Sequence, residues 1–235
     1  MSVERFLEMA RGGGLVPVWR DCLLDADTPV SAFAKLRRPP FAFLLESAPA
    51  GGETWSRYTF LGTEPRRAWR LRDRVVEWWS PERGWHDAHE SADPLEELRA
   101  ELSRHRPAEV PELGAFWSGA VGYFGYDVVR LLESLPSPPP RALDVPDALF
   151  VFTRTVVIVD NLRAQARVVV AVPVEPETGD GELRRLHAAA AAEIDDVMRR
   201  LRAPSALAPL ELDAAAPPAA GRSSYERARF LADVE

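Results

Sequence analysis

The chain has 235 residues, of which 46% are hydrophobic, 28% charged and 9% aromatic, and this composition excludes a disordered chain, a collagen-like chain and a disulfide-built miniprotein. Its 29 basic and 36 acidic residues give a net charge of −7, which makes nucleic acid a poor partner because phosphate binding needs a basic field. The single cysteine, Cys22, excludes an intrachain disulfide and a cysteine-based zinc site, and we interpret it as a small buried apolar group.

No apolar run approaches the ~20 residues that a membrane span requires. Residues 1–11 carry Glu4, Arg5, Glu8 and Arg11 and lack the apolar core of a signal peptide. We therefore expect no membrane partner and a reducing compartment, most simply the cytoplasm.

The first third of the chain predicts short strands interrupted by one helix. Thr28 is a suitable N-cap and Pro29 a suitable first residue for a helix that ends before Pro39-Pro40. The nearly all-apolar segment 41–47 is too short for a solitary helix and predicts a buried strand. A loop is expected at 48–55, and further strands are expected at 15–20, 57–61, 66–73 and 75–79.

The middle of the chain predicts another helix and a hairpin. Asp93 caps the helix, with Pro94 in its first position and Glu96 completing a capping-box-like pair. The β-branched runs at 147–160 and 167–172 predict a hairpin that turns through 161–166.

The strongest helix is expected at 182–202, where apolar residues recur every three or four positions. Strictly alternating strand–helix units are absent. The sequence therefore predicts an α+β fold with antiparallel sheets.

The last residues predict a change of organisation. Residues 203–222 are rich in Ala and Pro and are expected to form a linker. Ser223-x-x-Glu226 predicts a capping box, and the apolar face that follows stops at Glu235, in the third turn. A helix of about 12 residues is marginal unless it packs on something. We expect a domain over 1–202, a linker over 203–222 and, over 223–235, the first helix of a truncated domain; a short docked terminal helix is the alternative.

Local motifs predict no catalytic residue and no metal ligand. Gly119, Gly122 and Gly125 recur every three residues, which differs from the dinucleotide fingerprint, and we expect them to let strands pack closely against aromatic neighbours. His86 and His89 lie in a polar stretch that we interpret as a solvated loop.

Several segments in order carry a resemblance to a known family. They read PVWRDCLLDADTPVSAFAKL at 17–36, FLLES at 43–47 with RYTFLG at 57–62, SGAVGYFGYDVVRLLESLP at 118–136, and PDALFVF at 146–152. The chain thus resembles, over nearly its whole length, the N-terminal half of anthranilate synthase component I, in the chorismate-utilising enzyme family. Aminodeoxychorismate synthase component I is the closest cousin, and the opening proline-valine strand and the TPVSAF helix favour anthranilate synthase.

The resemblance implies antiparallel, orthogonally packed β-sheets flanked by helices, with 1–202 as a regulatory domain and 223–235 as the start of the chorismate-binding domain. The remainder of that domain would supply the catalytic residues and the carboxylates that bind Mg²⁺, so this chain alone is expected to be inactive and to hold no cofactor. The complete lyase would aminate chorismate with ammonia from a glutamine amidotransferase subunit, component II, and release pyruvate in tryptophan biosynthesis.

The resemblance also implies that this half senses tryptophan as a feedback inhibitor. Leu45 would provide an apolar wall, Glu46 would oppose the ammonium or hold the shape of the pocket, and Ser47 would bond to the carboxylate or to an N–H. Arg57 would clamp the carboxylate or tie the loop down. From the residues alone, Glu46 and Ser47 could instead simply end a strand, and Arg57 could form a structural ion pair.

In the implied mechanism, tryptophan bound between the two domains disfavours closure of the catalytic domain, for which a coupling of ~1–3 kcal/mol is sufficient. Two alternatives remain open. The chain could be the same half of aminodeoxychorismate synthase component I, or a free-standing tryptophan-binding regulatory module.

The sequence departs from the family pattern near two strand ends. The family often reads Gly-Arg-Tyr-Ser where this chain has Ser56 to Thr59, and Phe-Asp-His where it has Val159 to Asn161. The first change keeps a small residue and a hydroxyl, and the second is expected to affect only a turn.

Overall fold

The computed structural model describes residues 1–47, 57–104, 106–114, 116–136, 141, 143–205, 207–208, 211 and 221–234. These residues form two five-stranded antiparallel sheets. Sheet A has the order β1 (Gly14–Leu23), β10 (Gln165–Val174), β9 (Thr155–Asp160), β3 (Tyr58–Thr63) and β2 (Ala42–Glu46). Sheet B has the order β6 (Gly84–Glu90), β5 (Val75–Ser80), β4 (Arg67–Arg72), β8 (Ala148–Phe152) and β7 (Ala120–Phe124).

Helices flank both sheets. Those on sheet A are α1 (Val3–Ala10), α2 (Pro29–Leu36) and α4 (Asp180–Leu201), and the remaining helical segments are α3 (Pro94–Ser103), α5 (Arg227–Val234) and the 3-10 turns η1 (Pro111–Leu113) and η2 (Tyr126–Leu131). Two antiparallel sheets with flanking helices confirm the predicted α+β class. Among the described residues, no helix has both the length and the apolar character needed to cross a membrane.

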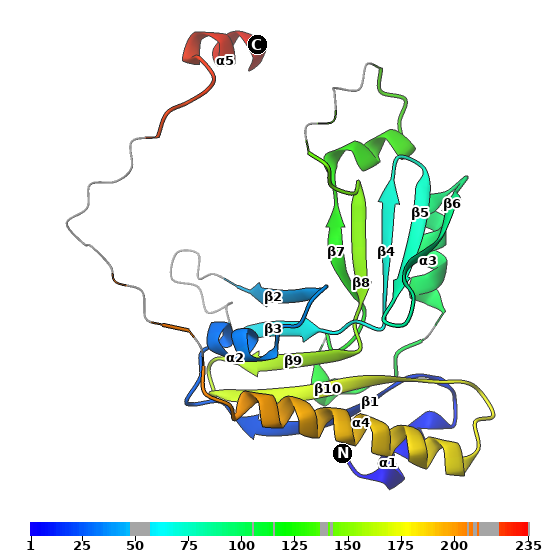
Figure 1. The fold of residues 1–235 in the computed structure, drawn as a ribbon. Coiled ribbons are helices and arrows are strands. Elements are labelled where there is room, and N and C mark those ends of the chain that lie inside the picture. Colours follow the sequence, from blue (N-terminus) through cyan, green and yellow to red (C-terminus); the bar gives the residue numbers. More distant parts are fainter. Residues whose placement is uncertain are drawn as a thin grey trace.

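The two sheets are joined twice by the chain. Residues 64–66 lead from β3 in sheet A to β4 in sheet B, and residues 153–154 lead back from β8 to β9. Figure 1 shows the strands of sheet B running crosswise to those of sheet A, with the two crossovers at the corner. The corner therefore fixes how the sheets are set against each other.

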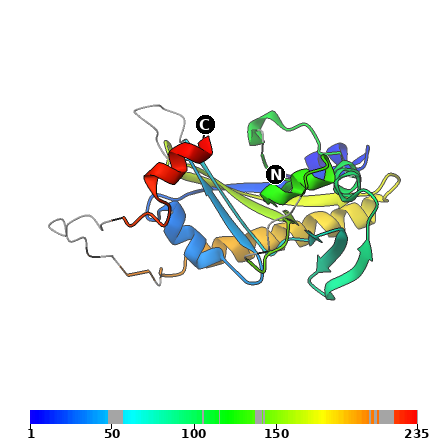
Figure 2. The ribbon, with the colours of Figure 1, turned by 90° about the horizontal axis from the view of Figure 1, so that it is seen from above.

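The main core lies between sheet A and its helices. Alternate valines of β9 and β10 point toward Ile194 and Val197 of α4 and Phe6 of α1, and all of these side chains are buried. Figure 2 shows α4 running along the length of the sheet A strands. We call this side of sheet A the helix face.

The opposite side of sheet A, the open face, carries a second apolar cluster. Trp19, Val156, Ile158 and Val169 point to this side because successive strand residues alternate between faces. The segment around η1 covers part of it through Leu113 and its neighbours. The uncovered remainder forms the candidate site described below.

The cap chemistry predicted from the sequence is largely confirmed. Thr28 and Ser31 form a reciprocal capping box at the start of α2, and Pro29 is its first residue. Asp93 accepts a hydrogen bond from the Glu96 backbone N–H at 3.0 Å, but the Glu96 side chain pairs with Arg99 instead of completing the box.

Four sequence predictions are wrong in detail. The segment 41–47 gives an edge strand, β2, whose residues are exposed or half-buried, because only one side of it is paired. The run 147–160 divides into β8 and β9, which lie in different sheets. The stretch that contains His86 and His89 is strand β6 rather than a loop, since it pairs with β5. Helix α5 begins at Arg227, and Ser223 bonds to the Tyr225 backbone in place of capping it.

The glycine prediction is confirmed at Gly122. This residue lies in β7 opposite Phe150, and a Cβ placed on it would lie 1.9 Å from the Leu149 carbonyl oxygen. Only glycine permits this close approach of the two strands.

The three expected parts of the chain stay a prediction. The 203–222 segment falls mostly outside the described residues. In α5 no residue is buried, and the side chains of Phe230 and Val234 are exposed.

Candidate functional site

A cavity of about 720 Å³ opens on the open face of sheet A. Its floor consists of Tyr58 and Phe60 from β3 and Ile158 from β9, which alternation brings to the same face. Phe116 closes one side and meets Phe60 edge-on, with ring centroids 5.4 Å apart. The floor is therefore aromatic and apolar.

Arginines and carboxylates form the rim of this cavity. Arg57 binds Asp160 through two nitrogens, Nη2 at 2.6 Å from Oδ2 and Nε at 3.1 Å from Oδ1. Arg167 pairs in the same way with Asp21, and its Nη2 lies 2.8 Å from Oδ2. Arg163 also lines the cavity, and no ion pair of its guanidinium is found within the described residues.

The Arg57–Asp160 pair sets the electrostatics on one side of the cavity. The hydrogen bonds from Arg57 lower the pKa of the Asp160 carboxyl below its ordinary value, and Asp160 in turn raises the pKa of Arg57. The Arg57 guanidinium also lies 4.9 Å from the centre of the Tyr58 ring. Arg57 is thus held in a structural ion pair, one of the two roles that the sequence left open, and it lines the cavity at the same time.

The other three predicted effector residues, Leu45, Glu46 and Ser47, do not lie together on one face of sheet A. Leu45 lies opposite Phe60 in the β2–β3 ladder and so belongs to the open face beside the cavity, with 44% of its surface exposed. Glu46 lies opposite Thr59 and belongs to the helix face. Ser47 follows the end of β2 and is exposed, and the next nine positions, 48–56, lie outside the described residues. Tryptophan binding by these residues stays a prediction.

Sequence reasoning missed most of the cavity. Tyr58 and Phe60 occur in the quoted RYTFLG segment, and their spacing of two residues could have placed them on one face. Phe116 and Asp160 carried no such signal, because they reach the cavity only through the tertiary fold.

The two departures from the family pattern touch each other. The Asn161 side-chain amide donates to the Thr59 hydroxyl at 3.0 Å, and Thr59 is fully buried. The change at 161 therefore reaches beyond the turn, and the Asn161 amide satisfies the hydroxyl that is kept at position 59.

The remaining candidate groups do not assemble a reactive centre. His89 bonds through Nε2 to Glu97 at 3.1 Å, and His86 bonds through Nδ1 to Asp87 at 2.9 Å. Within the part of the chain that the structure describes, no three His, Cys, Asp or Glu side chains come together to hold a metal, so these residues do not fit a Mg²⁺ site. Cys22 is half-buried, and burial raises the pKa of its thiol, which makes it a poor nucleophile.

Comparison with known proteins gives a consistent set of relatives. No family model matches the chain. An anthranilate synthase component 1 from Pseudomonas putida is 34% identical over 245 residues, covering 97% of this chain and 45% of that protein. The Aquifex aeolicus protein of the same name is 36% identical over 173 residues, covering 73% of this chain and 34% of that protein.

A further relative of that name, from Mycolicibacterium smegmatis, is 39% identical over 163 residues, covering 68% of this chain and 30% of that protein. The chain thus spans less than half the length of the curated relatives described here. The crystal structure of anthranilate synthase component I from Streptococcus pneumoniae TIGR4 matches with a TM-score of 0.50 and 22% identity, covering 79% of this chain and 37% of that one. This likeness shows a shared fold.

Proposed function

Because the chain belongs to the anthranilate synthase component I family, as a homologue of part of those proteins, we propose that it is their tryptophan-sensing N-terminal part. The observation that carries this proposal is the aromatic-floored, arginine-rimmed cavity on the open face of sheet A. In this proposal the cavity, together with Leu45 beside it, receives the tryptophan.

The chemistry of tryptophan suits the cavity. Its indole is a flat apolar group that packs favourably on Phe60 and Phe116 in offset or edge-on contact. Its carboxylate requires a cation, which Arg163 provides without breaking an existing ion pair. Its ammonium requires an acceptor, and Asp21 and Asp160 lie on the rim. A cavity of about 720 Å³ is large enough for a molecule of this size.

The predicted residues enter this proposal in different ways. Leu45 would extend the apolar wall, since it lies opposite Phe60 in the ladder. Arg57 would hold Asp160 in place and line the cavity. Glu46 would shape the strand end from the opposite face, and Ser47 would bond to the ligand at the edge of β2.

The activity of the longer relatives is part of the proposal. The complete protein would convert chorismate and ammonia to anthranilate and pyruvate, with ammonia from a component II subunit and Mg²⁺ held by a chorismate-binding domain. The chain alone would then be catalytically silent. Anthranilate formation from chorismate, ammonium and Mg²⁺, followed by fluorescence, is expected to stay at the level of a blank without protein, and turnover would contradict the silent role.

Tryptophan binding is the direct test. Isothermal titration of the chain with tryptophan is expected to show saturable binding that Leu45→Ala and Phe60→Ala each weaken about tenfold, because each removes apolar surface worth about 1–3 kcal/mol. Leu102→Ala is the matched control, since Leu102 is 48% exposed against 44% for Leu45 and lies on α3, on sheet B.

Three outcomes would count against the proposal or its residues. Absence of saturable binding contradicts the sensing role. Equal weakening by Leu102→Ala contradicts the position of the site. Full binding by the double variant Glu46→Ala, Ser47→Ala removes those two residues from it.

A further inference from the structure

A second cavity, of about 600 Å³, lies at the corner where the two sheets meet. We call it the corner groove. Its apolar wall consists of Trp79 and the prolines at 39, 40, 65 and 81, and its polar wall comes from α4 and the two crossover segments. It shares no lining residue with the cavity on the open face.

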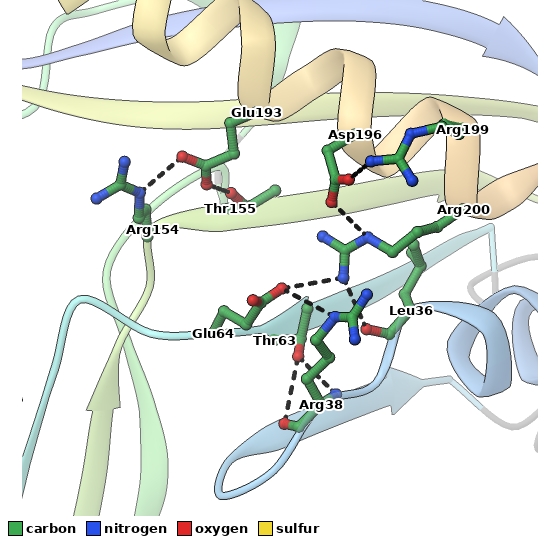
Figure 3. Close-up of polar contacts among 10 residues, drawn as sticks. All are labelled: Leu36, Arg38, Thr63, Glu64, Arg154, Thr155, Glu193, Asp196, Arg199 and Arg200. Atoms are coloured by element: carbon green, nitrogen blue, oxygen red, sulfur yellow. Dashed lines mark hydrogen bonds and ion pairs between the residues drawn. The ribbon is translucent and has the colours of Figure 1, made fainter. Parts of the chain in front are cut away.

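Figure 3 shows the ion pairs on the polar wall. Arg154 donates from Nε to Glu193 at 2.7 Å, and Arg200 donates to Glu64 at 2.9 Å. Arg200 also pairs with Asp196 at 2.8 Å. These arginines and carboxylates neutralise one another.

Arg66 is the exception in the corner groove. Its Nε is buried and has no hydrogen-bond partner, and its guanidinium forms no ion pair with the described residues. The nearest acidic influence is Glu101, which is already bound by Arg67 at 3.0 Å and by Arg104 at 3.4 Å. One carboxylate therefore faces three arginines.

Arg66 is half-buried, and partial burial of an unpaired charge is unfavourable for the folded chain. Partial withdrawal from water lowers the pKa of Arg66, because the charged guanidinium is disfavoured where it has no acidic partner. The guanidinium lies 6.0 Å from the centre of the Phe152 ring, which compensates only weakly. A fork of N–H donors kept free at the edge of a cavity matches the two oxygens of a carboxylate.

We propose that the corner groove is a binding site for a small carboxylate with a flat apolar body, whose carboxylate pairs with Arg66 and whose body lies against Trp79. The ligand is a monoanion rather than a phosphate. Glu82, exposed at the mouth of the groove and without an ion-pair partner among the described residues, repels a second negative charge. This site is separate from the proposed tryptophan site and does not depend on it.

Loss of the Arg66 charge is expected to raise thermal stability and to abolish carboxylate binding. Arg66→Met replaces an unpaired, half-buried charge by an apolar chain of similar length, so its thermal midpoint is expected to rise, while carboxylate binding is lost. An arginine with a purely structural role would give a lower midpoint. Arg66→Met therefore tests the binding site even if Arg66→Gln folds poorly.

Benzoate is the probe, and benzamide and inorganic phosphate are the comparison compounds. Benzoate is expected to bind in calorimetric titrations and to shift the Trp79 indole N–H resonance, which is assigned with Trp79→Phe. Benzamide lacks the negative charge, and phosphate lacks the flat apolar body and is repelled by Glu82, so each is expected to bind at least about tenfold more weakly.

The variants locate the site. Arg66→Gln is expected to weaken benzoate binding about tenfold or more. Arg185→Gln removes the same charge from an exposed pair with Glu182 at the other end of α4 and is expected to leave binding unchanged. Equal affinity in Arg66→Gln and the parent, equal loss in both variants, or a benzoate shift confined to Trp19 and Trp117 near the open face would each overturn the proposal.

Discussion

At the scale of single residues, ion pairs and buried hydrogen bonds explain why particular side chains are present. Arg57, which precedes β3, binds Asp160 at the end of β9, and Asp160 also accepts hydrogen bonds from the backbone N–H groups of Leu162 and Arg163 in the following turn. One carboxylate thus supports the rim of the cavity and the hairpin that follows it.

Asp160→Asn is expected to lower the free energy of unfolding at neutral pH, because the ionised carboxylate binds Arg57 in the folded state. The Asp160 pKa is lowered from an ordinary 3.8, so this stabilisation is complete above that value and is lost as the pH falls through the lowered pKa. Urea unfolding at a series of pH values should show the two proteins converging in acid. Asp144→Asn is the control, since its side chain is 91% exposed and its pair with Arg72 is screened by water. Convergence on raising the pH would contradict this account.

Thr59 and Asn161 are expected to behave as a coupled pair. Asn161→Ala leaves a fully buried hydroxyl without its partner and should cost about 1–3 kcal/mol of unfolding free energy. Thr59→Val removes that hydroxyl, so the double variant should cost less than the sum of the single ones by about 0.5 kcal/mol or more. Denaturant unfolding of all four proteins measures the difference, and simple additivity would show that the hydrogen bond contributes nothing.

At the scale of elements, helices and strands form largely where local patterns predict them. The Thr28 cap, the Asp93 cap and the apolar stripe of α4 are local signals, and each gives a helix within a few residues of the expected position. The exceptions are β2 and β6, because whether a strand is buried or even formed depends on its neighbours. Hydrophobicity in β2 indicated a strand but not an edge strand.

Gly122→Ala is expected to destabilise the β7–β8 pair. The new methyl group would meet the Leu149 carbonyl at 1.9 Å, and relieving this overlap should cost about 1–3 kcal/mol or more. Gly181→Ala in α4 is a matched control, because nothing lies within 4 Å of its Cβ position and alanine should stabilise the helix by about 0.5–1 kcal/mol. Urea unfolding followed by circular dichroism compares the free energies of unfolding of the two variants. An unchanged free energy of unfolding in Gly122→Ala would mean that β7 and β8 can move apart at little cost.

At the scale of the whole molecule, one helix holds both connections between the sheets. Glu193 of α4 binds Arg154, and it also accepts a hydrogen bond from the Thr155 hydroxyl, at the return crossover. Arg200, two turns further along α4, binds Glu64 at the outgoing crossover. Figure 3 shows both sets of contacts along the same side of the helix. Helix α4 therefore contacts both crossover segments between sheet A and sheet B.

The double variant Glu193→Gln, Arg200→Gln is expected to loosen the corner without unfolding either sheet. Amide hydrogen exchange should become faster at Arg66, which donates to Phe152, and at Ala171, which donates to Arg154, since both bonds are made at the crossovers. Amides in the centre of β10 should be unaffected. The control is Glu182→Gln, an exposed position at the start of α4. Unchanged exchange at both crossover amides would show that the backbone alone holds the corner.

The α+β class, the capped helices, the β9–β10 hairpin and the family resemblance can all be predicted from the amino-acid sequence, because those features depend on residues close together in the chain or on local motifs. Three features could be seen only in the folded chain: which strands share a sheet, that Leu45 and Glu46 lie on opposite faces, and that Phe60, Phe116 and Asp160 meet around one cavity. The folded chain also leaves the buried Nε of Arg66 without a hydrogen-bond partner among the described residues. The reason is physical: a periodic pattern assigns each side chain to one face of its own element, whereas a site is formed where faces of elements distant in the sequence pack together.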